Sequence, residues 1–95
     1  DLKEILIASH IVGWAESNDG ERLDVENGIL LAPHIDALFD KHLISFQDDG
    51  KILISNRLDS RLIELLGINH SIILPTTNGM FKYLKRHRER FYEKN

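Results

Sequence analysis

Cysteine is absent from the chain, and proline, tryptophan and methionine are scarce, with two, one and one residues respectively. The lack of cysteine excludes a disulfide bond, cysteine-ligated zinc, an iron–sulfur cluster and a thiol nucleophile. Any metal ion must therefore bind histidine, aspartate, glutamate or asparagine. Long apolar runs are missing too, since no segment approaches the ~18 apolar residues that a membrane-spanning helix needs.

The length of 95 residues predicts one domain at most, because domains cluster at roughly 100 to 150 residues. Hydrophobic residues at 42% and charged residues at 28% are typical of a folded globular protein. The opening sequence DLKEILIASH lacks the basic region of a signal peptide, so we expect a soluble, cytoplasmic protein. Because the chain begins at Asp1 without an initiator methionine, we expect a fragment of a longer protein; an upstream domain or a homo-oligomer remains open.

Charge is divided unevenly along the chain. Residues 1–79 contain 13 acidic and 6 basic residues, a net charge of −7, whereas residues 80–95 contain 6 basic and 2 acidic residues, a net charge of +4. The overall charge of −3 argues against a protein that coats nucleic acid, but a local basic strip can still contact phosphates.

The first half of the chain predicts the order strand, loop, strand, short helix. Residues 5–14 are apolar and β-branched and favour a buried strand, although a helix fits this length as well. A polar loop, a second strand and a helix are then expected at residues 15–27, 28–33 and 34–41. In the helix, Ile35, Leu38 and Phe39 form one apolar stripe.

The second half predicts a hairpin followed by helices. Two apolar runs flank a turn at Gly50, which supplies the positive φ that such turns need. A short helix at residues 61–66, capped by Asp59 or Ser60, and a further strand at residues 70–75 are expected next. A final helix, capped by Thr77 or Asn78, has an apolar stripe and an outward basic arc. The stripe comprises Met80, Leu84, His87 and Phe91, and the arc comprises Lys82, Lys85, Arg86 and Arg90.

Four polar residues stand in unusual places: His10 in an apolar segment, Asn27 before the second strand, and the pair Asp36 and Asp40 on the helix. Each also has an ordinary explanation. His10 can be a hydrogen-bonded structural residue, Asn27 a turn residue, and the two acids a helix-dipole partner and a surface charge. Trp14 is expected in the core.

Taken together, ASHIVGW and the later segments NGILL, LFD, LISF and DDG resemble the HNH nucleases of the histidine-metal finger (ββα-metal) superfamily, in the branch related to restriction endonucleases. The resemblance covers roughly residues 6–58. It implies one HNH domain over residues 1–95, with a ββα-metal core at residues 5–42 followed by a β-hairpin and C-terminal helices.

The resemblance also implies roles for individual residues. His10 falls on the general base, and Asn27 on the asparagine that ties the long loop to the strand. Asp36 and Asp40 fall on the metal ligands of the helix, and His34 is a further candidate ligand. Ser9 stands where many relatives have another ligand, so water is expected to complete a shell that suits Mg²⁺ or Mn²⁺.

The function that the resemblance implies is metal-dependent DNA endonuclease activity, which leaves 5′-phosphate and 3′-hydroxyl ends, in restriction or defence. The basic arc of the last helix is then either a phosphate-contact strip or a solvated helix face. Two alternatives belong to other classes: a nucleic-acid-binding module whose metal site has decayed, and a protein-interaction domain that keeps only the scaffold.

Overall fold

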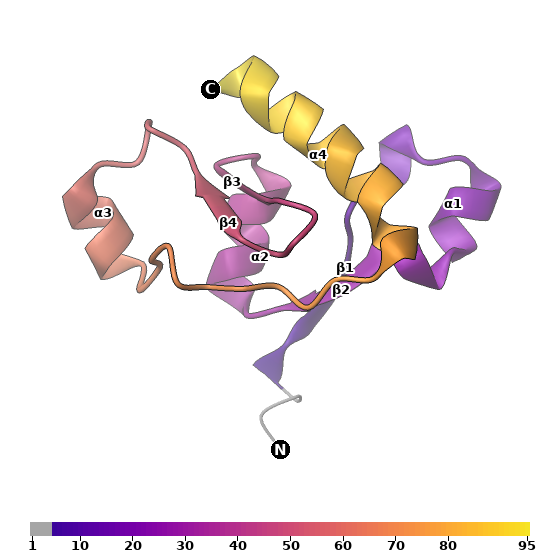
Figure 1. Cartoon of the computed structure of the whole chain (residues 1–95), viewed down its shortest axis with the longest axis horizontal. Helices are drawn as coiled ribbons and strands as arrows, with labels where there is room; N and C mark the ends of the chain where they lie inside the picture. The colour runs from indigo at the N-terminus through magenta and orange to yellow at the C-terminus, as the bar shows by residue number, and fades with distance from the viewer. Residues whose placement is uncertain (1–4) are drawn as a thin grey trace.

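The described chain, residues 5–95 of a computed structural model, consists of helices and two small antiparallel sheets (Figure 1). This composition confirms the predicted α+β class. The strands and α-helices are, in chain order, β1 (Ile7–His10), α1 (Asp19–Leu23), β2 (Gly28–Leu31), α2 (Pro33–Asp40), β3 (Ile44–Phe46), β4 (Ile52–Ile54), α3 (Ser60–Leu65) and α4 (Phe81–Lys94). Three 3₁₀ turns are η2 (Trp14–Glu16), η3 (Val25–Asn27) and η4 (Asn78–Met80). Within residues 5–95, none of the helices is both long and apolar enough to cross a membrane.

The first sheet pairs β1 with β2, with His10 opposite Gly28. In β2, Ile29 and Leu31 point into the core while Leu30 remains 54% exposed, which is the alternation of a half-buried strand. The predicted buried strand over residues 5–14 is therefore too long. A two-stranded sheet has an uncovered face, so β1 itself is partly exposed and only Ile11 and Val12, which follow it, are buried.

The segment predicted as a polar loop, residues 15–27, contains a short helix. Asn18 accepts a hydrogen bond from the Glu21 backbone (2.9 Å), and the Glu21 side chain accepts one from the Asn18 backbone (2.9 Å). This reciprocal capping box starts α1, and the Asp24 side chain caps η3 in turn. The asparagine-x-x-glutamate spacing that signals such a cap is present in the sequence.

The helix after β2 forms as predicted, with Ile35, Leu38 and Phe39 buried. Two residues after its end, directly after the C-cap Lys41, His42 adopts a left-handed conformation with a φ of 58°. The backbone N–H of His42 donates to Phe39 (3.0 Å) and that of Leu43 donates to Leu38 (2.9 Å), which is the Schellman pattern in which glycine is usual.

The predicted hairpin is confirmed as β3 and β4, with Gly50 at a φ of 87° in the turn. A Cβ atom at Gly50 would lie 2.0 Å from the Leu74 carbonyl oxygen, so no other residue fits. The strand predicted at residues 70–75 is wrong. Only one bridge forms, between Lys51 and Ile73, because Pro75 has no N–H group with which to extend a ladder.

Helix α3 follows its prediction, but the cap predicted for the final helix at Thr77 or Asn78 is wrong, because the 3₁₀ turn η4 occupies these positions and α4 begins at Phe81 without a side-chain cap. Asp59 caps α3 by accepting the Leu62 N–H (2.8 Å). The apolar stripe of the final helix is buried as expected, together with Tyr83, and α4 lies along β3. Figure 1 shows the segment that leads from α3 to α4 running past the first sheet.

His87 joins α4 to the rest of the core. Its Nε2–H donates to the Phe39 carbonyl (2.8 Å), so its Nδ1 accepts the hydroxyl of the buried Ser45 (2.7 Å). The imidazole ring is stacked between Phe39 at 3.7 Å and His42 at 4.4 Å, measured between ring centroids. In the neutral ring both nitrogens are satisfied, one as a donor and the other as an acceptor.

The protonation of His87 predicts a loss of stability in mild acid. Burial lowers the pKa of His87 from 6.5 to about 4, so the folded state binds this proton more weakly than the unfolded state. The stabilisation by the neutral ring is complete above pH 6.5 and is lost as the pH falls toward 4, in total by about 3 kcal/mol. Urea unfolding across this pH range measures the loss.

His87→Gln provides the comparison, because glutamine can occupy the site without titrating. We expect the variant to be less stable than the wild type at neutral pH but to have a shallower pH dependence between 6.5 and 4. Equal slopes for the two proteins would mean that His87 does not cause the acid sensitivity.

Candidate active site

The predicted general base, His10, lies at the end of β1 and is half-buried. Its Nε2 is 3.0 Å from the backbone carbonyl oxygen of Arg22. A carbonyl can only accept, so Nε2 carries the proton and, in the neutral ring, Nδ1 is the nitrogen that remains able to take one. The ring therefore has the arrangement of a base whose second nitrogen is anchored to the protein.

Asn27 is completely buried beside the end of β1. Its Oδ1 accepts the backbone N–H of Val12 (2.8 Å), and its Nδ2 donates to the Glu21 carbonyl (3.1 Å). The Asn27 carbonyl also accepts the N–H of Ile11 (2.8 Å). The side chain thus connects the segment after His10 to α1.

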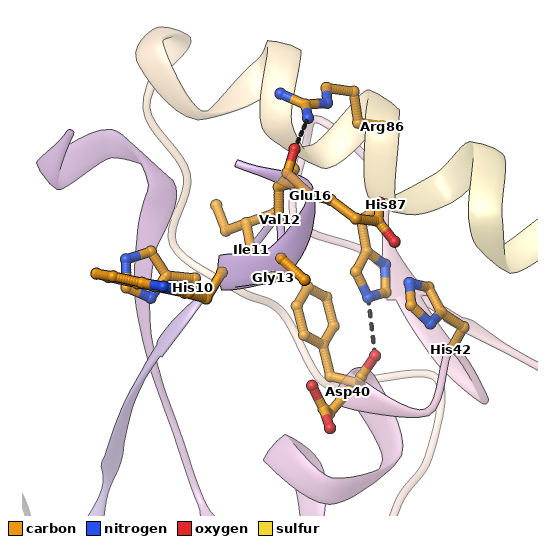
Figure 2. Close-up of a pocket in the computed structure, with 12 residues that line it drawn as sticks. His10, Ile11, Val12, Gly13, Glu16, Asp40, His42, Arg86 and His87 are labelled. Atoms are coloured by element: carbon orange, nitrogen blue, oxygen red, sulfur yellow. Dashed lines mark hydrogen bonds between the residues drawn. The ribbon is translucent and has the colours of Figure 1, made fainter. Parts of the chain in front are cut away.

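A cavity of about 240 Å³ opens beside His10, and acidic and histidine side chains line it. Asp40, His42 and Glu16 are among them, with His87 and Arg86 on the α4 side. Figure 2 shows His10 and His42 on opposite sides of this cavity, with Asp40 near its base. The structure thus brings His10 and Asp40, the predicted base and one predicted metal ligand, to one cavity, together with Arg86 of the predicted basic arc.

A family model for HNH endonucleases matches residues 1–47. The chain belongs to the HNH endonuclease family. No curated protein matches the chain. The matched residues include β1, β2 and α2, and with them His10, Asn27 and both helix acids. Family membership indicates nuclease activity in general, which is the hydrolysis of phosphodiester bonds.

The two remaining predicted metal ligands, Asp36 and His34, lie on α2 outside the lining of this cavity. Asp36 is half-buried, and its Oδ1 is buried with no hydrogen-bond partner among residues 5–95. His34 is exposed in the first turn. In the part of the chain that the structure describes, no three histidine or acidic side chains are grouped closely enough to hold a metal ion together.

The side chains of Asp36 and Asp40 fit a hard metal ion better than they fit structural zinc. A buried carboxylate oxygen without a partner costs free energy, and a cation would remove that cost. Asp36 and Asp40 offer oxygen ligands only, which suits a hard ion such as Mg²⁺ that keeps several waters. The four-ligand shell of structural zinc does not fit these side chains.

His42 is a cavity residue that sequence analysis did not single out. Burial, followed by the charge of Lys94, lowers its pKa, so its ring is neutral at pH 7. Lys94 Nζ lies 3.4 Å from His42 Nδ1. The sequence carried one signal for this position, because a histidine stands at the helix end where glycine is usual. Trp14 was also predicted wrongly, since it is 60% exposed at the cavity instead of in the core.

The basic arc of α4 is less uniform than its spacing predicts. Lys82 and Lys85 are exposed, whereas Arg86 binds the Glu21 carboxylate (2.5 Å) and the Glu16 carbonyl (2.8 Å). Figure 2 shows Arg86 reaching Glu16 at the cavity. The remaining member of the arc, Arg90, lies 3.5 Å from Glu16 and 3.4 Å from Glu93. Acidic side chains of the same chain therefore already pair with two of the four arc residues, Arg86 and Arg90.

Proposed function

We propose that this HNH protein is a divalent-metal-dependent DNA endonuclease in which His10 is the general base. The observation that carries the proposal is the geometry of His10. One of its nitrogens is anchored to the Arg22 carbonyl, its ring borders the 240 Å³ cavity, and Asp40 lines the same cavity. Hydrolysis of a phosphodiester needs a base that works near neutral pH, and histidine has an ordinary pKa of ~6.5.

In the proposed reaction, Nδ1 of His10 removes a proton from a water molecule whose oxygen attacks the phosphorus atom. The new bond joins that oxygen to phosphorus, the bond from phosphorus to the 3′ oxygen breaks, and the departing 3′ oxygen takes a proton from solvent. The products carry 5′-phosphate and 3′-hydroxyl ends. Asn27 keeps the segment after His10 in place through the Val12 hydrogen bond.

Asp36 and Asp40 would hold the metal ion, with His34 as a further candidate ligand. Mg²⁺ or Mn²⁺ would supply positive charge for the scissile phosphate and the departing oxygen as a Lewis acid. We assign the ββα-metal finger to residues 5–42, which contain β1, β2 and α2 in this order with α1 between the two strands, within one HNH domain over residues 1–95. A role in restriction or defence, with DNA as the substrate, completes the proposal.

A second function, the binding of nucleic acid without cleavage, has one observation in its favour. The described residues contain no preformed group of three metal ligands, as expected for an HNH fold that binds nucleic acid without cutting it. Metal binding separates the two functions, because only the nuclease requires it.

The first test is the replacement of His10 by Ala. Loss of a general base lowers the cleavage rate by roughly 10²- to 10⁴-fold. Nicking of supercoiled plasmid with Mg²⁺ or Mn²⁺ measures the rate, and thermal unfolding tests whether the fold is retained. His70→Ala, at an exposed histidine, is the matched control and should cut normally. A His10→Ala protein that cuts at the wild-type rate removes His10 from the mechanism.

The metal site is tested by changing both Asp36 and Asp40 to Asn. We expect weak binding of Mn²⁺ to the wild type and tighter binding when a DNA duplex adds phosphate ligands. The double variant should bind at least roughly tenfold more weakly, since even the outer partners of metal ligands are worth that much. Calorimetric titration with and without DNA measures both affinities.

Glu64→Gln combined with Glu89→Gln removes two exposed acids from other helices and controls for net charge. The control should bind Mn²⁺ like the wild type. If the Asp36 and Asp40 double variant also binds and cleaves normally, the ligands lie elsewhere, and His34 is the first to test.

The basic arc is tested at its two exposed lysines. Replacing Lys82 and Lys85 by Ala should weaken DNA binding and reduce the slope of log affinity against log salt by roughly 1 to 2, at ~0.9 per phosphate contact. Arg57→Ala with Arg61→Ala, at two exposed arginines before and in α3, is the control. Unchanged affinity and slope would leave the arc as a solvated helix face.

A further inference from the structure

We propose that Arg22 and Trp14 are positioning residues that fix the orientation and the tautomer of His10. The inference rests on the proposed role of His10 as a base. Neither residue needs to touch DNA for this role. Both act through the imidazole ring, one from the end of α1 and the other from η2.

The first contact comes from the end of a short helix. Carbonyl groups in the last turn of a helix have no partner within the helix. In α1 the Glu21 carbonyl is used by Asp24 and by the Asn27 side chain, and the Arg22 carbonyl is used by His10 Nε2. Position 22 therefore supplies the acceptor that keeps the proton on Nε2 and leaves Nδ1 free.

The Arg22 side chain holds this helix end against the segment after β1. Its Nε donates to the Trp14 carbonyl (3.0 Å), and its guanidinium lies 4.5 Å from the centre of the Trp14 ring. Asp19 is 3.4 Å from the same guanidinium. Because Arg22 bridges α1 and η2, it sets the distance between the carbonyl that anchors His10 and the strand that carries it.

Trp14 makes the second side-chain contribution to this arrangement. Its ring meets the His10 ring edge to face, at 5.8 Å between centroids and 80° between planes. At 60% exposure, this large apolar side chain contributes little to the core, so core packing does not explain its position. The indole ring instead contacts the guanidinium of Arg22 and the imidazole of His10. Two side chains and one carbonyl thus restrict the rotation of the base.

The tautomer of His10 is the direct measurement. In protein labelled with ¹⁵N-histidine, above about pH 8 where ordinary imidazoles are neutral, nitrogen shifts distinguish the two tautomers. We expect wild-type His10 to be in the Nε2–H form alone. Arg22→Ala and Trp14→Ala should each give a mixture, whereas Trp14→Phe, which keeps an aromatic edge, should restore the single form. His87, also held as Nε2–H by a carbonyl, is an internal standard.

Cleavage provides the second readout. Arg22→Ala and Trp14→Ala should lower kcat by roughly tenfold with little change in KM, because a misaligned base affects the chemical step and not substrate binding. Trp14→Phe should recover most of the loss. Arg61→Ala, at an exposed arginine of the similarly short helix α3, should leave both the tautomer and kcat unchanged. Arg22→Lys keeps the charge without the planar group and should resemble Arg22→Ala.

The two readouts separate this inference from the proposed function. A tautomer and a kcat that stay at wild-type values in both alanine variants would overturn the positioning role. Altered tautomers in a protein that never cuts DNA would support the positioning role and reject the nuclease. If Arg22→Ala does not fold, Trp14→Ala decides, because its exposed side chain can be removed without opening the core.

Discussion

The buried amide of Asn27 is the contact on which the candidate site depends. It joins the backbone after β1 to the end of α1 through Val12 and Glu21. A buried amide left without partners would cost about 1 to 3 kcal/mol, so one arrangement of strand and helix is strongly preferred. The bond between His10 and the Arg22 carbonyl exists because this arrangement brings the two segments together.

The second constraint is the backbone conformation of His42, which lies on the opposite side of the cavity from His10 (Figure 2). A left-handed conformation at His42 costs about 1 to 2 kcal/mol for a residue with a Cβ atom. Aromatic pairs contribute about 0.5 to 1.5 kcal/mol beyond their buried area, and the His42 ring stacks on His87. The two effects are of similar size, so the stack offsets much of the strain. Histidine is therefore tolerated where glycine is usual, and it presents an imidazole to the cavity.

Electrostatics connects the C-terminal helix to the site. Hydrogen bonding from the Asn18 backbone, followed by the hydrogen bond and charge of Arg86, lowers the pKa of Glu21, so this acid stays ionised and holds α4 against α1. The same pairing neutralises one cation of the basic arc. The charge of the helix is thus divided between Arg86, which faces the protein, and Lys82 and Lys85, which face solvent.

The sequence by itself determined the elements whose patterns are local. The stripe of α2, the turn at Gly50, the Asp59 cap and the buried face of α4 all follow from spacing or from single-residue conformational preferences. The resemblance to HNH nucleases also came from residues near one another in the chain, and the family match agrees with it. Tertiary structure decided what depends on contacts between distant segments: the shortened β1, the exposed Trp14, the pairing of Arg86 and the cavity that His10 and Asp40 both line. No local pattern encodes these, because each depends on which surface of one segment another segment happens to cover.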